Sequence, residues 1–269
     1  MIVFLIVLAV ILLLYLLCLQ GRNGHPGMET LQSWFYAHRG LHAEGRPENG
    51  MSAFRAALEH SYGIELDIHL LKDGNLAVIH DSTLKRTTGA EGRIEDLTTE
   101  QLTNYRLEGT EDTIPTFREV LDLFDGKAPM IVELKPVDNN HGALCKAACE
   151  MLDTYHGPFC IESFDPRCIY WLKKNRPELI RGQLIENTIG KKNYPVAWYL
   201  RWVMTLQLTN FLTRPDFVAH KFADRKFISN GFVHHLWKTQ GVTWTLKTKE
   251  DFDIAVKEGY LPIFEGFIP

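Results

Sequence analysis

The sequence has few cysteines and no excess of positive charge. Its five cysteines include no CxxC pair of the kind that holds a structural metal, and they form no evident disulfide framework. We therefore expect Cys145, Cys149, Cys160 and Cys168 to be reduced core residues. A formal net charge of -4 over 269 residues argues against a nucleic-acid-binding surface, so no nucleic-acid partner is expected.

Charged residues are also missing from the amino terminus. Residues 2–19 are almost wholly aliphatic, and as a helix they would span roughly 27 Å, close to the thickness of a bilayer core. The run lacks the basic start and the small cleavage-site residues of a signal peptide. We predict an uncleaved single-pass transmembrane helix at 1–20, a polar tether at 21–31 and a folded domain at 32–269. Because Arg22 follows the helix and no basic residue precedes it, the charge bias favours a cytoplasmic domain at the cell membrane.

Strand-like and helix-like segments alternate through the folded domain. Such alternation is typical of a parallel α/β barrel or sheet, and the count is near eight βα units. The predicted strands cover 34–37, 64–69, 76–79, 130–134, 159–163, 180–184, 217–219, 242–246 and 261–264. The predicted helices cover 51–60, 99–105, 116–124, 142–154, 166–175, 232–238 and 250–257.

Acids and histidines gather at residues 63–81. Glu65, Asp67 and His69 alternate with apolar residues, so a strand sends them to one face. A turn then leads to a second apolar run that ends in His80 and Asp81. This pattern fits either a functional site or a half-exposed strand pair whose polar face meets water.

Two other strand ends carry polar groups. His38 and Arg39 follow the first strand, where barrel enzymes place catalytic residues. Glu133 lies in the otherwise apolar strand 130–134, and Lys135 follows it; a lone acid in a buried strand needs a partner.

The stretch 194–212 is apolar and rich in aromatic residues, and only Arg201 and Gln207 interrupt it strongly. We predict an amphipathic helix here. It fits either a core helix packed on the barrel or an interfacial helix near a membrane, where Trp198, Tyr199 and Trp202 suit the headgroup zone.

Several short motifs, in this order and spacing, resemble the glycerophosphodiester phosphodiesterase family, in its membrane-anchored bacterial type. The resemblance covers roughly residue 34 to the carboxy terminus. It rests on His38-Arg39-Gly40, Pro47-Glu48-Asn49, Glu65-Leu66-Asp67, Lys72-Asp73-Gly74, His80-Asp81, Glu133-Leu134-Lys135, Ser163-Phe164-Asp165 and Trp244-Thr245. Two departures from the family pattern are Gly50 after the Pro-Glu-Asn triplet and Glu265 in the closing segment. Neither departure is expected to touch the catalytic groups.

The resemblance implies a (β/α)8 TIM barrel of the phosphodiesterase type. In that fold Glu65, Asp67 and Glu133 would lie at the carboxyl ends of neighbouring strands and bind one divalent cation. Carboxylate ligands favour Mg²⁺ or Ca²⁺ over thiophilic metals, and the choice between these two stays open.

The same resemblance implies roles for the remaining motif residues. His38 and His80 suit general base and general acid, and Arg39 and Lys135 would hold the phosphodiester. Trp244 would stack on the substrate and Glu48 would support the site. Structural ion pairs remain the alternative for Arg39, Lys135 and Glu48, and a core role for Trp244.

The activity implied is metal-dependent hydrolysis of glycerophosphodiesters, which are small molecules, to sn-glycerol 3-phosphate and an alcohol. One alternative is a lysophospholipase D acting on monoacyl lysolipids, which the apolar 194–212 stretch and a membrane anchor would favour. Another is a barrel that binds phosphate without turnover.

Overall fold

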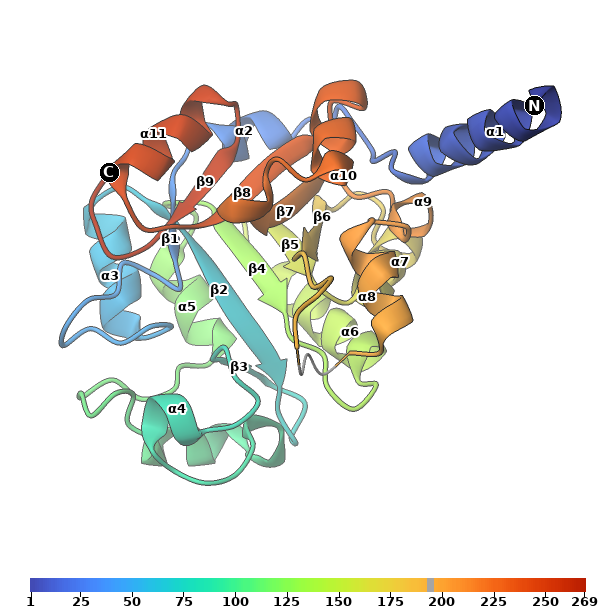
Figure 1. The fold of residues 1–269 in the computed structure, drawn as a ribbon. Coiled ribbons are helices and arrows are strands. Elements are labelled where there is room, and N and C mark those ends of the chain that lie inside the picture. The colour runs from blue at the N-terminus through green and yellow to red at the C-terminus, as the bar shows by residue number, and fades with distance from the viewer. Residues whose placement is uncertain (193–195) are drawn as a thin grey trace.

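Eight parallel strands form a closed barrel (Figure 1). The computed structural model describes residues 1–192 and 196–269. The strand order is β1-β9-β8-β7-β6-β5-β4-β2, and β1 also pairs with β2, which closes the barrel. The strands are β1 (Tyr36–His38), β2 (Gly63–Leu70), β4 (Met130–Leu134), β5 (Phe159–Ser163), β6 (Arg181–Ile185), β7 (Phe217–Lys221), β8 (Gln240–Leu246) and β9 (Leu261–Phe264); β3 (Leu76–Val78) pairs antiparallel with β2. The predicted TIM-type barrel is confirmed.

Helices surround the barrel, and most begin where their sequences predict. Thr116 and Glu119 form a capping box at the start of α5, and Asp165 caps α7 before Pro166. The longer helices are α3 (Met51–Glu59), α5 (Phe117–Phe124), α6 (His141–Leu152), α7 (Pro166–Asn175), α8 (Trp198–Thr205) and α11 (Lys249–Lys257). The short ones are α2 (Met28–Gln32), α4 (Lys85–Thr88), α9 (Asn210–Thr213), α10 (Ile228–Gly231) and the turns η1 (Ile94–Asp96), η2 (Thr99–Asn104), η3 (Phe222–Asp224) and η4 (Phe232–Leu236). The predicted helices 99–105 and 232–238 are in fact a 3₁₀ segment and a single π-helical turn.

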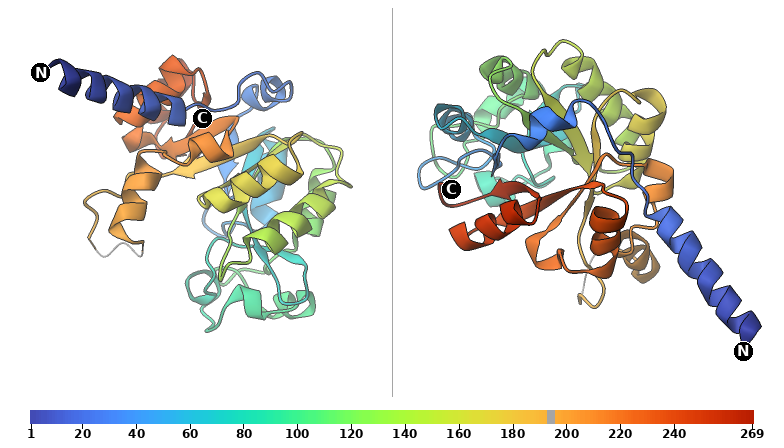
Figure 2. Two further views of the ribbon diagram at one scale, coloured as in Figure 1. Left: turned by 90° about the vertical axis from the view of Figure 1, so that its right-hand side faces the viewer. Right: turned by 90° about the horizontal axis from the view of Figure 1, so that it is seen from above.

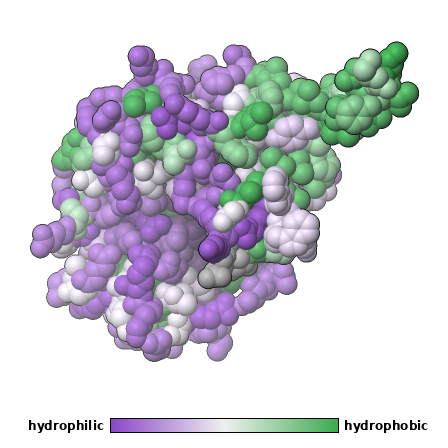
Figure 3. Space-filling view, viewed as in Figure 1, coloured by the Kyte–Doolittle hydropathy of each residue, from purple (hydrophilic) through white to green (hydrophobic). Residues whose placement is uncertain are grey.

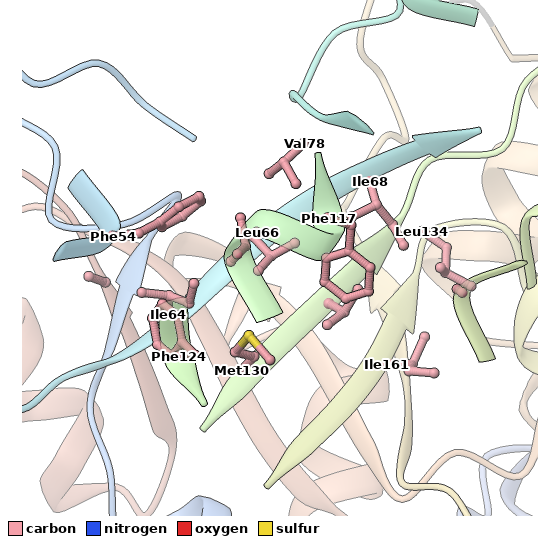
Figure 4. Close-up of a cluster of buried hydrophobic side chains, with 14 of the residues drawn as sticks. Phe54, Ile64, Leu66, Ile68, Val78, Phe117, Phe124, Met130, Leu134 and Ile161 are labelled. Atoms are coloured by element: carbon pink, nitrogen blue, oxygen red, sulfur yellow. The ribbon is translucent and has the colours of Figure 1, made fainter. Parts of the chain in front are cut away.

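The alternation along β2 fixes which side chains face the barrel interior. Ile64, Leu66 and Ile68 are fully buried and join the cluster that includes Phe54 of α3 and Phe117 of α5 (Figure 4). Burying each such side chain contributes about 1.5–3 kcal/mol. A shift of one residue would move all of them to the other face of the strand. Their packing therefore also fixes the alternate residues of β2, which point the opposite way.

The segment between β2 and α5 forms a small lobe beside the barrel (Figure 1). Its own apolar cluster includes Leu71, Ile79, Leu84 and Ile94. The backbone N–H of Ile79 donates to the carbonyl of Asp67 at 3.1 Å. This contact ties the chain just before His80 to the end of β2.

The amino-terminal helix α1 (Ile2–Cys18) projects from the barrel, and its surface is hydrophobic (Figures 2 and 3). It has 17 residues, so it is about 26 Å long. Within residues 1–192 and 196–269, no helix combines the length and the apolar character that crossing a membrane requires. The predicted transmembrane helix at 1–20 is therefore not supported, and the predicted cytoplasmic orientation depended on it.

Residues 21–31, for which the sequence predicts a polar tether, contact the barrel. Arg22 pairs with Asp216 at 2.6 Å, and Leu31 in α2 is buried in an apolar cluster that includes Tyr36 and Phe217. Further upstream, Leu19 is fully buried, and the Trp237 indole N–H donates to the Leu16 carbonyl at 2.8 Å. The chain between α1 and β1 thus packs along the barrel surface.

The stretch 194–212 contains two helices, α8 and α9, and residues 194 and 195 lie outside the described residues. Trp198, Tyr199 and Trp202 of α8 are 72%, 55% and 48% exposed. In α8 only Thr205 is buried. The interpretation of this helix as a core helix is therefore wrong, because its aromatic side chains face outward.

Candidate active site

A cavity of about 360 Å³ opens at the carboxyl ends of the barrel strands. All the predicted site residues except Asp67 and Glu48 line it directly. The lining residues are His38, Arg39, Glu65, His80, Glu133, Lys135, Glu162, Phe164, Leu184, Glu186, Lys221, Trp244 and Ile263.

Strand register brings the acids together. His38 on β1 lies opposite Glu65 on β2, and Asp67 lies opposite Glu133 on β4. One oxygen each from Glu65, Asp67 and Glu133 can be chosen so that all three lie within 4.8 Å of one another. The sequence prediction of one carboxylate cluster thus agrees with the geometry.

Burial and mutual repulsion set the protonation of these acids. Burial, then the charges of Asp67 and Glu133, raise the pKa of Glu65 well above its usual range. Burial also raises the pKa of Glu133, to about 7. Burial alone would raise the pKa of Asp67, but cationic neighbours, chiefly Lys135, hold that pKa below its usual range. Three such acids need compensating positive charge.

Part of that charge comes from Lys135 and Arg39. Lys135 Nζ donates to Glu133 Oε1 at 2.8 Å and lies 3.3 Å from Asp67 Oδ1. Arg39 Nε lies 3.4 Å from Asp67 Oδ2, and Arg39 Nη1 donates to Glu48 Oε1 at 2.8 Å. Burial alone would lower the pKa of Lys135, but the negative charges of Glu133 and Asp67 together raise it. Both residues therefore stay cationic inside the cavity.

His38 is held by a residue that lies far along the chain. Its Nδ1 is 2.7 Å from Glu265 Oε2, while its Nε2 lies 3.9 Å from Glu65 Oε2. Burial lowers the pKa of His38, and the Glu265 hydrogen bond opposes that shift. The hydrogen bond from His38, in turn, lowers the pKa of Glu265 to about 2. The expectation that Glu265 does not touch the catalytic groups is therefore wrong.

His80 has a similar carboxylate partner. Its Nδ1 lies 2.6 Å from Asp81 Oδ1, and Asp81 accepts from Arg86 Nε at 2.5 Å. Arg86 also donates to both oxygens of Glu48, at 2.7 and 2.8 Å. Burial lowers the pKa of His80. Glu48 thus contacts both Arg39, which follows His38, and Arg86, which bonds the Asp81 partner of His80.

His69 takes a different place from the other polar residues of β2. Its Nδ1 is 2.7 Å from Glu95 Oε1, and its Nε2 is 3.1 Å from the His80 carbonyl. It therefore supports the backbone that carries His80, in agreement with its omission from the predicted metal ligands.

Aromatic side chains form the opposite wall of the cavity. Trp244 meets Phe164 edge to face, with ring centroids 5.8 Å apart. The Trp244 indole nitrogen is buried and has no hydrogen-bond partner among the described residues. The predicted substrate-facing position of Trp244 agrees with the cavity lining.

Four charged residues of the site were not recognised in the sequence: Glu162, Glu186, Lys221 and Glu265. Glu162 on β5 lies opposite Glu133 on β4 and is 1% exposed. Its Oε2 has no hydrogen-bond partner among the described residues. Glu162 is a lone acid in the apolar run of residues 159–163, which is the same pattern that indicates a site residue at Glu133. Glu186 and Lys221 lie at strand ends without a motif, and Glu265 stood out only as a departure from the family pattern, so only the barrel register identifies their place in the site.

Gly50, the second departure from the family pattern, has a structural reason. It is the N-cap of α3, and an added Cβ would lie 2.6 Å from Asp112 Oδ2. That carboxylate accepts from the backbone N–H of Ser52 at 2.8 Å. Asp112 thus caps the helix in place of a serine or threonine at position 50.

The acid cluster fits a hard divalent cation. It offers three carboxylates, which are the ligands that such cations prefer. Asp67 Oδ1 is buried, and apart from the Lys135 ammonium 3.3 Å away it has no polar partner among the described residues. A second group that could hold a metal ion consists of His38, His42 and Glu265. This group is less buried than the three carboxylates, and it includes His38, which lines the cavity.

Comparison with known proteins agrees with this geometry. Residues 38–264 match the glycerophosphoryl diester phosphodiesterase family. A glycerophosphodiester phosphodiesterase of Caldanaerobacter subterraneus subsp. tengcongensis is 30% identical over 236 residues, which cover 83% of this chain and 89% of that protein. The rat lysophospholipase D GDPD1 is 33% identical over 132 residues, covering 44% of this chain and 40% of that protein.

A solved structure shares the fold. An Oleispira antarctica phosphodiesterase, in complex with the product sn-glycerol-3-phosphate, superposes with a TM-score of 0.70 at 21% identity, covering 86% of this chain and 92% of that one. The family match covers most of the chain, including every predicted site residue. The chain therefore belongs to the glycerophosphoryl diester phosphodiesterase family and is a phosphoric diester hydrolase.

Proposed function

We propose that this enzyme hydrolyses glycerophosphodiesters to sn-glycerol 3-phosphate and an alcohol with the help of one divalent cation, Mg²⁺ or Ca²⁺. The observation that carries the proposal is a cluster of three buried carboxylates, two of which line the cavity, beside two histidines that are each bonded to a carboxylate. We place the catalytic domain at 32–269.

Glu65, Asp67 and Glu133 would hold the cation. When bound, it supplies a Lewis acid that offsets negative charge on the phosphoryl oxygens. Lys135 and Arg39 already lie beside these acids, so they add positive charge at the same end of the cavity. A phosphodiester carries one negative charge that grows in the transition state, and fixed cations stabilise it there.

His38 and His80 would move the protons. Each has Nδ1 on a carboxylate, which leaves Nε2 for the substrate. One imidazole takes the proton of the attacking hydroxyl while the other gives a proton to the leaving alcohol oxygen. By family resemblance, the glycerol 2-hydroxyl attacks first; the P–O bond to the alcohol breaks, and water then opens the cyclic phosphate.

The remaining predicted residues would position the reaction. Trp244 offers an apolar face to the substrate. Glu48 bonds both Arg39 and Arg86, so it would hold the Arg39 guanidinium in place.

Product analysis tests this proposal. The full chain is incubated with glycerophosphocholine and Mg²⁺ or Ca²⁺, beside His80→Ala, and products are identified by mass spectrometry. We expect sn-glycerol 3-phosphate and choline from the wild type and at least 100-fold less from the variant. Metal-dependent binding of the diester without any product would instead support a non-catalytic barrel.

Lysophospholipase D activity is the second candidate. Two observations favour it: the partial match to the rat enzyme and the exposed aromatic side chains of α8. The same assay with lysophosphatidylcholine separates the two activities. Choline with lysophosphatidic acid, at a higher kcat/KM than for glycerophosphocholine, would establish the lipid enzyme.

A further inference from the structure

A lysine that no motif predicts lies in the outer part of the cavity. Lys221 is the last residue of β7 and lies opposite Trp244 on β8. Its Nζ is 5.4 Å from the centroid of the Trp244 ring, in a cation–π arrangement. The same Nζ hydrogen-bonds Glu186, which follows β6. An aromatic face and a carboxylate thus surround one ammonium group.

The carboxylate of this group is well fixed. The Glu186 side chain is 11% exposed, and Lys191 Nζ lies 2.6 Å from the same oxygen that contacts Lys221. Burial would raise the pKa of Glu186, but the two lysines lower it, so it stays ionised. Phe164 packs edge to face on Trp244 and holds the indole plane. Lys221, by contrast, is 41% exposed and can move away into water.

An aromatic face beside a carboxylate is the arrangement that binds quaternary ammonium groups. In this chain the lysine ammonium already occupies it. A substrate with a cationic alcohol would have to displace Lys221 or lie beside it, and either costs favourable interactions. A substrate with an uncharged or anionic alcohol meets no such obstacle.

The depth of the cavity indicates which arm of the substrate reaches this place. Glu65, Asp67 and Glu133 are nearly inaccessible, whereas the Lys221 side chain is 41% exposed, so we place Lys221 nearer the mouth of the cavity. The glycerol arm is short, and its 2-hydroxyl must reach a catalytic imidazole. The variable alcohol therefore extends toward Lys221.

We propose that Lys221 fills a cation-binding subsite made by Trp244 and Glu186, and that it makes the enzyme select glycerophosphodiesters whose alcohol carries no positive charge. This specificity rests on the proposed function of the cavity. Lys221 acts here as a specificity-determining residue and takes no part in proton transfer.

The test compares two diesters that share the glycerol phosphate and differ in the alcohol: glycerophosphocholine, which is cationic there, and glycerophosphoglycerol, which is uncharged. The kcat/KM of each is measured for the full chain, for Lys221→Met, for Lys221→Met/Glu186→Gln, and for Lys257→Met as a control at an exposed position of α11. The readout is the ratio of the two kcat/KM values within each protein.

We expect Lys221→Met to raise the choline-to-glycerol ratio at least about tenfold, because the vacated site then accepts the trimethylammonium group. The double variant loses most of that gain, and Lys257→Met keeps the wild-type ratio. A ratio that stays within twofold in Lys221→Met overturns the proposal. An equal fall for both substrates also overturns it, since Lys221 would then contact the shared glycerol phosphate.

A binding measurement tests the subsite independently of turnover. Tetramethylammonium is titrated into each protein by calorimetry. We expect at least about tenfold tighter binding to Lys221→Met than to the wild type or the double variant. If no protein hydrolyses either diester but this binding order holds, the proposed function fails while the subsite stands. Equal binding to all the proteins refutes the subsite.

Discussion

The two sides of the cavity differ in what holds their polar residues. On β1, β2 and β4 the acids and cations are buried and joined in one network, in which Lys135 and Arg39 contact several carboxylates. On β6 to β9 the lining is mainly apolar, with Leu184, Trp244 and Ile263, and its charged pair is partly exposed. We therefore propose that the first side stabilises charge during the reaction and that the second distinguishes one alcohol from another. Changes on the first side should lower kcat, and changes on the second should alter KM.

His80→Ala should have the largest effect. We expect kcat to fall by about 10²–10⁴, because a positioned proton donor or acceptor is lost. The His80 side chain is 31% exposed, so the free energy of unfolding should change by less than about 1 kcal/mol. Steady-state kinetics and urea denaturation measure the two quantities. His156→Ala, at an exposed position, is the control; a loss below tenfold in His80→Ala would contradict the assigned role.

Glu133→Gln should weaken cation binding at least about 100-fold, because a carboxylate ligand is lost. In the wild type, Mg²⁺ or Ca²⁺ at a hundred times its Kd should stabilise the fold by about 2.7 kcal/mol. Thermal unfolding with and without each ion measures this difference. The variant should show no shift at the same concentration, and Glu100→Gln on the surface should behave as the wild type does. An undiminished shift in Glu133→Gln would place the cation elsewhere.

Glu265→Gln should lower kcat/KM by about 10–100-fold, since His38 loses a charged hydrogen-bond partner. Glu265 raises the pKa of His38 against the effect of burial, so its removal lowers that pKa further. A base works only while neutral and loses activity as the pH falls through its pKa. If His38 is the base, the acid limb of the kcat/KM profile therefore moves to lower pH. A shift to higher pH would contradict this arrangement.

Trp244→Ala should have the smallest of these effects. We expect KM to rise about tenfold, with kcat within about threefold of the wild type, because the aromatic wall contacts the substrate more than the reacting atoms. Tyr170→Ala is the control, because Tyr170 is an exposed aromatic residue outside this cavity. A large fall in kcat with unchanged KM would remove the distinction between the two sides.

Local patterns predicted the parts of this molecule that depend on local rules. The bounds of β4, β5 and α7 follow from apolar runs, capping and Pro166. The clustering of Glu65, Asp67 and Glu133 followed from strand alternation and the family motifs. The bounds of these elements depend on residues close together in the chain, whereas the family motifs were needed to join Glu133 to the other two acids.

Features set by distant contacts could not be predicted. Glu265 meets His38 only because β9 closes the barrel beside β1. Lys221 meets Trp244 through the register of β7 and β8. The membrane prediction, which is not supported, rested on hydropathy alone: hydropathy registers the apolar run of α1, but the helix ends at Cys18 and the next residue, Leu19, is buried against the barrel.

The most direct test of the account is the metal dependence of turnover by the wild-type chain. The enzyme is treated with EDTA, freed of the chelator and then titrated with Mg²⁺ or Ca²⁺ while release of sn-glycerol 3-phosphate is followed. We predict at least a 100-fold loss of activity and a recovery that saturates at one ion per chain, since Glu65, Asp67 and Glu133 form one cluster. Full activity in EDTA would contradict it.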